Sequence, residues 1–181
     1  FLEREIGIGP RKGKKFKVEC DTTYVSTLEF KNNSLIQMTL SFDVKDHKRN
    51  HIELYGDKGS IVVPDPNMFG GSVFTCLGLG EKWTEHETHN LELGKINIKS
   101  QSSRANESPT NANYRGAGLS EMAYSIENKN KHMCNGELSL HVLDIIQSIM
   151  RSTKTQKTEL LSTECVIPEL FTQDKIKKIL K

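Results

Sequence analysis

Two polar side chains stand in segments that we expect to be loops, where ligand sites are often built on a rigid scaffold. His47 lies in "DVKDHKRNH", between two expected strands, and Arg115 lies in "NYRGAGL", just before an expected helix. Arginine can grip a carboxylate, a phosphate or a hydroxyl group. Each position also has an ordinary explanation, which is a solvated charged tip for His47 and a contact that fastens the loop for Arg115.

A third polar residue, His141, stands inside an expected helix. It follows Leu138 by three residues and precedes Ile145 by four, so it shares the apolar side of that helix. Histidine in a site can act as an acid or a base near neutral pH. Buried polar groups are normally hydrogen-bonded, and the position favours a bonded core histidine over a catalytic one.

The segment "IELYGDKGSIVVPDPNMFGG", residues 52–71, contains glycines of the kind that a phosphate-binding loop needs. Such a loop also needs a helix whose N-terminal amides face the anion, but "YGDKGS" leads into "IVVP", an apolar run stopped by a proline. We therefore expect a β-hairpin whose turn holds Gly56 and Gly59. "GIGPRKG" has neither an apolar strand before it nor a helix after it, so it does not predict a nucleotide site.

Residues 16–44 alternate with a period of two, which predicts two strands joined by the "KNNS" turn. In the second strand an apolar face starts at Ile36. The opposite, polar face consists of Gln37, Thr39, Ser41 and Asp43. A polar sheet face can meet water, line a ligand cleft or form a subunit interface, and the pattern alone favours water.

Four further strands are predicted, at residues 50–56, 60–63, 72–77 and 82–87. A polar loop over 94–113 follows, then a short helix in "GLSEMAYSIENK" with Ser120 as its cap, and a longer helix that Asn135 can cap. "QKTELL" predicts a last strand and "DKIKKILK" a helical tail. Strands followed by helices, without regular alternation, predict one α+β domain over residues 1–181 with an open sheet.

Composition excludes several function classes. The 25 basic and 23 acidic residues are mixed along the chain, and a net charge of +2 does not predict nucleic-acid binding. The cluster "GPRKGKKFK" is expected to be a solvated loop. No apolar run is long enough to span a bilayer, and no signal peptide opens the printed sequence, so a cytoplasmic location is expected.

The cysteines and the known motifs predict no metal site and no catalytic centre. Cys20, Cys76, Cys134 and Cys165 lie 56, 58 and 31 residues apart, without the close pair that a zinc or redox site requires, and four reduced thiols are expected. None of the hydrolase, metalloprotease or nucleotide-binding signatures is present. The chain begins "FLEREIGIG", without an initiator methionine, and we expect it to be a piece of a longer protein.

Five phrases in order resemble the C-terminal domain of the glucose-fructose oxidoreductase, inositol dehydrogenase and rhizopine-catabolism (Gfo/Idh/MocA) family. They are "TTYVSTLEF", "SFDV", "IELYGDKGSIVVPDPNMFGG", "NYRGAGLSEMAYSIENK" and "NGELSLHVLDIIQSIM". The match runs from about Gly13 to Leu170. It implies an open, mostly antiparallel sheet with helices packed on one face, of the type found in the C-terminal domain of glyceraldehyde-3-phosphate dehydrogenase.

The resemblance also implies a function. In that family an N-terminal Rossmann domain binds NAD or NADP, and the C-terminal domain closes the cleft for a sugar or polyol and commonly forms the homo-oligomer interface. For this chain it implies subunit contact or cleft lining by the polar sheet face, and we carry His47, Arg115 and His141 as cleft candidates. The family's glycine fingerprint and catalytic residues lie upstream of the matched segment.

We therefore expect no catalytic, cofactor-binding or metal-binding residue in this chain, and no nicotinamide binding or turnover by the chain alone. The missing Rossmann domain, a second copy of the chain and a small sugar or polyol are the expected partners, with no nucleic acid or membrane. A second hypothesis is a stand-alone, non-catalytic module that binds a carbohydrate or a protein. An upstream nucleotide-binding domain would distinguish the two.

Overall fold

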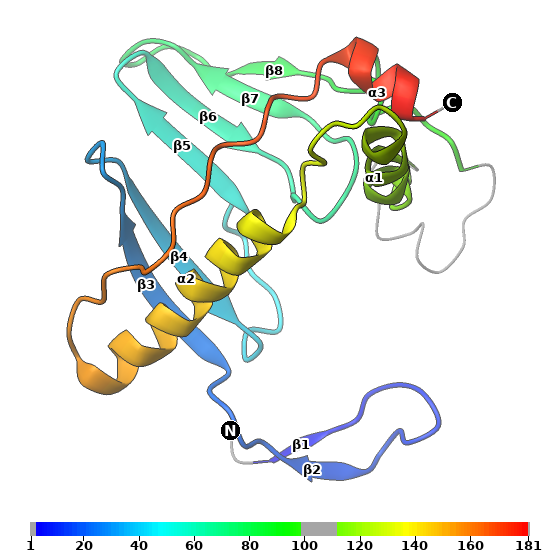
Figure 1. The fold of residues 1–181 in the computed structure, drawn as a ribbon. Coiled ribbons are helices and arrows are strands. Elements are labelled where there is room, and N and C mark those ends of the chain that lie inside the picture. Colours follow the sequence, from blue (N-terminus) through cyan, green and yellow to red (C-terminus); the bar gives the residue numbers. More distant parts are fainter. Residues whose placement is uncertain (1–2, 99–111, 181) are drawn as a thin grey trace. The chain divides into compact units, whose positions relative to one another are not determined.

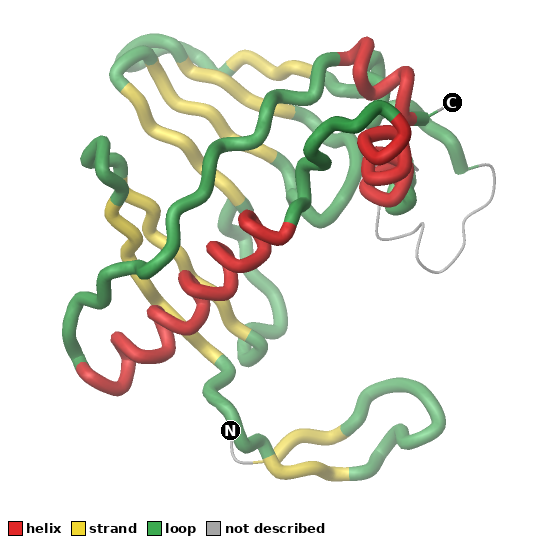
Figure 2. Tube along the Cα trace, in the orientation of Figure 1, coloured by secondary structure: helices red, strands yellow, loops and turns green. Residues whose placement is uncertain are grey.

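The computed structural model describes residues 3–98 and 112–180. In these residues it has eight strands and three helices, which confirms the predicted α+β class (Figure 1; Figure 2). The strands are β1 (Glu3–Glu5), β2 (Lys15–Lys17), β3 (Thr23–Glu29), β4 (Leu35–Ser41), β5 (Ile52–Gly56), β6 (Gly59–Val63), β7 (Val73–Cys76) and β8 (Thr84–His86). The helices are α1 (Ala117–Glu127), α2 (Gly136–Thr155) and α3 (Gln173–Ile179). Most of the polar loop predicted over 94–113 lies outside the described residues.

The chain forms two compact units. The first consists of Phe1–Lys48 and Leu143–Ser162, and the second of Arg49–Val142 and Thr163–Lys181. Strands β1 to β4 belong to the first unit and strands β5 to β8 to the second, while the division falls inside α2. The single domain expected over residues 1–181 stays a prediction.

In the first unit, β3 and β4 form an antiparallel hairpin with the two predicted faces. Tyr24 lies opposite Leu40, Ser26 opposite Met38, and Leu28 opposite Ile36. Residues that face each other across a ladder share one side of the sheet, so this side is the apolar one. Gln37 and Thr39 occupy the other side, and both are exposed.

A second hairpin in the first unit was not predicted. β1 pairs with β2 so that Arg4 lies opposite Phe16. Beyond the strands, the Ile6 N–H donates to the Lys14 carbonyl and the Ile6 carbonyl accepts from the Gly13 N–H. The cluster "GPRKGKKFK" therefore supplies the turn and the second strand of this hairpin, where the sequence analysis expected only a loop. Strands of three residues are too short to show a period in the sequence.

In the second unit, β5 to β8 pair in sequence order as a four-stranded antiparallel sheet. Gly56 lies opposite Gly59, which confirms the predicted hairpin and excludes the phosphate loop. Gly59 has φ +144°, and a Cβ on it would lie 2.4 Å from the carbonyl oxygen of Cys76. Glycine is therefore required here, both for the backbone conformation and for the close approach of β7.

The described strands form three sheets, which corrects the expectation of one open sheet. The connection between β4 and β5 carries backbone donors that bond to nearby side chains instead of to another strand. The N–H of Asp43 donates to Ser41 Oγ at 3.1 Å, and that of His47 donates to Asp46 Oδ1 at 2.8 Å. Such local bonds compete with a ladder.

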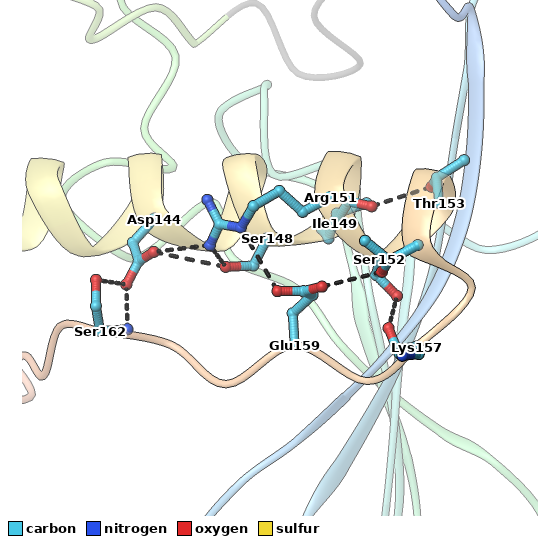
Figure 3. A network of polar contacts seen from close by, with 10 residues as sticks. Asp144, Ser148, Ile149, Arg151, Ser152, Thr153, Lys157, Glu159 and Ser162 are labelled. Carbon is cyan, nitrogen blue, oxygen red and sulfur yellow. Dashed lines mark hydrogen bonds and ion pairs between the residues drawn. The ribbon is translucent and has the colours of Figure 1, made fainter.

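The prediction of a strand at "QKTELL" was wrong, because the structure has no strand in these residues. The segment after α2 runs back along this helix and bonds to its side chains (Figure 3). Ser162 N–H donates to Asp144 Oδ2 at 2.7 Å, and Ser152 Oγ–H donates to the Lys157 carbonyl at 2.7 Å. Arg151 Nε lies 3.6 Å from Glu159 Oε2, so an ion pair supports the same contact, and Asp144 on the same helix lies 3.6 Å from the guanidinium of Arg151.

The two longer helices begin differently from each other. Asn135 caps α2, since its Oδ1 accepts from the N–H groups of Glu137 and Leu138, as predicted. Ser120 does not cap α1, whose N-cap is Gly116. Ala117 N–H already donates to the Tyr114 carbonyl at 2.8 Å, so helical bonding begins before Ser120. The tail helix α3 is capped by Thr172 and buries Ile176 and Ile179.

Gly59→Ala is expected to destabilise the second unit by about 1–3 kcal/mol, because the new Cβ meets backbone and the left-handed conformation is strained. Urea unfolding followed by the fluorescence of Trp83, the only tryptophan in the chain, measures the change. Gly7→Ala is the matched control, since nothing lies within 4 Å of its added Cβ. Equal midpoints for the two variants would contradict the assigned role of Gly59.

Candidate functional site

One face of the β5–β8 sheet contains a hollow of about 350 Å³. Its lining residues are Asn50, Glu53, Tyr55, Val62, Phe74 and Trp83. The register explains the grouping, since Glu53 lies opposite Val62, and Val62 opposite Phe74. Alternate residues along a strand share a face, so Tyr55 lies on the same side as Glu53. This hollow is a candidate binding site within the described residues.

Glu53 is the charged group of the hollow, and two neutral donors hold its carboxylate. Asn50 Nδ2 donates to Oε1 at 2.6 Å, and the Tyr55 hydroxyl donates to Oε2. The bond from Tyr55 has the larger effect and the bond from Asn50 the smaller, and both lower the pKa of Glu53. The same bond to Glu53 raises the pKa of Tyr55. Glu53 therefore remains ionised at neutral pH, while Tyr55 remains a neutral donor.

The remaining lining is apolar and aromatic. Val62 and Phe74 are half-buried, and the side chain of Trp83 is 49% exposed. No lining residue is a cysteine, serine or histidine that could act as a nucleophile with a base. The arrangement can bind a ligand that has an apolar part and hydrogen-bond donors.

Glu53, Tyr55 and Trp83 were not predicted from the sequence as site residues. The signal was present, because Glu53 and Tyr55 alternate with Ile52 and Leu54, and a turn at Gly56 and Gly59 fixes which residues of β6 face them. What the sequence did not indicate was the position of Trp83, which depends on the pairing of β7 with β8.

Arg115 lies in the second unit and holds a neighbouring loop. Its guanidinium donates to the Asn67 carbonyl at 3.2 Å and to Asn67 Oδ1 at 3.4 Å. Next to it, Tyr114 makes an edge-to-face contact with Phe69, with ring centroids 5.7 Å apart. These contacts are the loop-fastening role that the sequence left open, and the role in a substrate cleft stays a prediction.

His141 is half-buried in α2, and its Nδ1 lies 2.9 Å from Thr163 Oγ1. Within the described part of the chain, no hydrogen bond or ion pair joins it to Arg115. Its bond to Thr163 fits a hydrogen-bonded structural histidine, and its place in a cleft stays a prediction.

His47 is exposed and belongs to the first unit, whereas Arg115 and His141 belong to the second. Its N–H donates to Asp46 Oδ1, which shapes the turn between β4 and β5. Within the second unit Arg115 and His141 have different hydrogen-bond partners, and the place of His47 in a cleft stays a prediction.

At the end of the polar sheet face, Asp43 is the centre of a hydrogen-bond cluster. Thr22 Oγ1 donates to Asp43 Oδ2 at 2.5 Å, Thr23 Oγ1 donates to the same oxygen at 2.8 Å, and Arg4 forms an ion pair with Oδ1. Ser41 lies 2.7 Å from Thr23, with the two hydroxyl oxygens paired. The bonds from Thr22 and Thr23, followed by Arg4, lower the pKa of Asp43 from 3.8 to about 2. Asp43 thus fastens β1 to the base of the β3–β4 hairpin.

Helix α1 has an inverted pattern of burial. Leu119 is 73% exposed and Ile126 is 67% exposed, whereas Glu121 is 3% exposed and Ser125 is 1% exposed. Glu121 is satisfied inside, since it accepts from Ser125 Oγ at 2.9 Å and from the Met133 N–H at 3.1 Å. The apolar stripe of α1, formed by Leu119, Met122 and Ile126, therefore faces away from the interior of its unit.

Three further findings bear on function. All four cysteines are free thiols. No group of three or more His, Cys, Asp or Glu residues within 3–98 and 112–180 is arranged to hold a metal ion. Among the same residues, none of the helices combines the length and the apolar character needed to cross a bilayer.

Comparisons with known proteins identify no relative. No protein-family model matches the chain, and neither a curated protein nor a solved structure matches it at a significant level.

The cluster around Asp43 is expected to make the stability of the first unit depend on pH. Because folding lowers its pKa, the ionised carboxylate stabilises the folded state above pH 3.8, and this contribution is lost as the pH falls towards about 2. Asp43→Asn should therefore be destabilising at neutral pH, and its difference from the unmodified chain should shrink below pH 3.8.

Thermal unfolding at a series of pH values measures this difference, with Asp57→Asn, in the turn between β5 and β6, as the control. A difference between Asp43→Asn and the unmodified chain that is independent of pH would contradict the role of the carboxylate.

Proposed function

We propose that this chain is the C-terminal substrate-binding and assembly domain of an NAD(P)-dependent oxidoreductase that acts on a sugar or polyol hydroxyl group. The fold would then be of the type found in the C-terminal domain of glyceraldehyde-3-phosphate dehydrogenase. The five phrases that resemble the Gfo/Idh/MocA family support the proposal, and so does the α+β class with antiparallel strand pairs.

The observation that carries the proposal is the exposed apolar stripe of α1. Leu119, Met122 and Ile126 lie in "NYRGAGLSEMAYSIENK", one of the five phrases. Fully burying such a side chain contributes about 1.5–3 kcal/mol, and a contiguous exposed stripe is typical of a surface that another domain or subunit covers. A neighbouring nucleotide-binding domain would supply that cover.

The glycine-rich segment "GIGPRKG" does not fit a dinucleotide. The glycines of "GIGPRKG" lie in the β1–β2 hairpin, where no helix N-terminus follows them. In the proposed enzyme the nicotinamide, held by another domain, accepts or gives the hydride. This chain contributes walls and position, with Arg115 ordering the loop at Asn67 and His141 joining α2 to Thr163.

The proposal is tested directly by asking whether the native protein contains an upstream nucleotide-binding domain. The native protein, purified from its source cells, is expected to have an intact mass above the 20.5 kDa of this chain. The difference should equal the mass of one further domain of about 100–150 residues. It should also reduce NAD or NADP with one member of a panel of aldoses and polyols. The 181-residue chain alone should give no enhancement of NADH fluorescence. A native mass of 20.5 kDa, or NADH binding by the chain alone, would refute the assignment.

Leu119→Asp in the native protein is expected to lower kcat/KM at least about tenfold, because a charge in a covered apolar surface separates the two domains. Leu79→Asp is the control, since Leu79 is a fully exposed leucine in the turn between β7 and β8. Steady-state kinetics with the identified substrate measure both variants, and equal losses would show that the α1 stripe is not the domain contact.

The second candidate function is a stand-alone module that binds a carbohydrate or a protein without catalysis. The hollow on the β5–β8 sheet favours a module of this kind with a protein ligand in particular, because an exposed tryptophan beside a carboxylate suits a side chain with both apolar and charged parts. A native mass of 20.5 kDa together with ligand binding by the chain alone would support this candidate.

A further inference from the structure

The sheet face that contains the hollow has negative charge at both ends. A row of paired residues crosses the four strands in the order Glu53, Val62, Phe74 and Glu85. Two apolar residues therefore separate the two carboxylates, and adjacent residues of the row lie on strands about 4.8 Å apart. Trp83 precedes Glu85 by two residues and lies on the same face.

Neither carboxylate has a cationic partner among the described residues. Glu53 accepts only from the neutral groups of Asn50 and Tyr55, and Glu85 accepts from Ser72 Oγ at 2.6 Å. Within the described part of the chain, no Lys, Arg or His lies within 4.0 Å of the Glu53 or Glu85 oxygens. The hydrogen bonds hold the charge of Glu53 in place and leave it without a counterion.

The polar atoms of the hollow are mostly acceptors. After their bonds to each other, Glu53 retains lone pairs on both oxygens, and the Tyr55 oxygen and Asn50 Oδ1 also remain able to accept. The donors left over are one N–H of Asn50 and the indole N–H of Trp83. A neutral sugar brings donors and acceptors in similar numbers, whereas a cationic amine brings donors alone.

The aromatic lining favours the same kind of ligand. The faces of Trp and Tyr rings carry negative potential and attract a cation that lies over them. Val62 and Phe74 add an apolar floor that an alkyl stem can cover. A quaternary ammonium would suit the rings but has no N–H to donate to Glu53, so a primary amine satisfies both parts of the hollow.

We propose that the hollow lined by Glu53, Tyr55 and Trp83 binds a primary alkylammonium group, of the kind that ends a lysine side chain. The ammonium lies against the Glu53 carboxylate and its stem covers Val62 and Phe74. The proposal stands apart from the oxidoreductase assignment, because it concerns a face of the sheet and requires neither a nicotinamide nor a second domain.

A titration of the 181-residue chain with n-butylammonium chloride tests the proposal, because Trp83 is the only tryptophan and its indole N–H gives a single signal in a ¹⁵N-labelled sample. A saturable shift of that signal is expected. 1-Butanol has the same stem without the charge and should bind at least about tenfold more weakly. No saturable shift with n-butylammonium, or equal binding of 1-butanol or glucose, would overturn the proposal.

Glu53→Gln keeps the shape of the side chain and removes its charge. It is expected to weaken n-butylammonium binding at least about tenfold, and rising salt should weaken binding to the unmodified chain. Glu29→Gln, on β3 of the first unit, is the matched control and should leave binding unchanged. Unchanged affinity in Glu53→Gln, with signals outside the hollow intact, would refute the role of the carboxylate.

A peptide with the sequence "GPRKGKKFK", residues 9–17, distinguishes the source of the ammonium group. Tighter binding of this peptide than of n-butylammonium would support a lysine of a polypeptide, including a second copy of this chain. Equal binding per amine would support a free amine as the ligand. Both results require the shift of the Trp83 signal and its loss in Glu53→Gln.

Discussion

The register of the four-stranded sheet depends on the turn at which Gly56 faces Gly59. Because side chains alternate between the two faces of a strand, a slip of one residue would move Glu53 and Tyr55 to the other side of the sheet. Gly59 also constrains the pairing of β6 with β7, since its backbone approaches the Cys76 carbonyl too closely for any side chain. The Gly56–Gly59 turn places Glu53 opposite Val62, and Trp83 joins the hollow through the pairing of β7 with β8.

Both longer helices bury polar side chains while apolar ones remain exposed. Glu121 and Ser125 are buried in α1, and Asp144 and Ser148 are buried in α2. Burying a polar group costs free energy unless it is hydrogen-bonded, and here each carboxylate accepts from a backbone N–H of a following segment. The polar sides of the helices thus order the chain locally, while large apolar side chains such as Leu119 and Ile126 stay exposed.

The strand pattern could be predicted because it depends on neighbours in sequence. The faces of β3 and β4, the β5–β6 hairpin and the Asn135 cap all follow from local spacing. The missed features depend on distant partners. "QKTELL" has the composition of a strand, but this segment lies along α2. There the N–H of Ser162 donates to the carboxylate of Asp144, which precedes it by 18 residues. Arg4 meets Asp43 across 39 residues, and Trp83 enters the hollow only through the pairing of β8 with β7.

The sheet of the second unit also has a consequence for the order of folding. Each of its strands pairs with the next one in the chain, and the whole sheet is contained between Ile52 and His86. Closing such short connections costs little chain entropy, and local contacts of this kind form fast. During synthesis on the ribosome the sheet can therefore assemble from the Gly59 turn outward before α1, α2 and α3 have emerged.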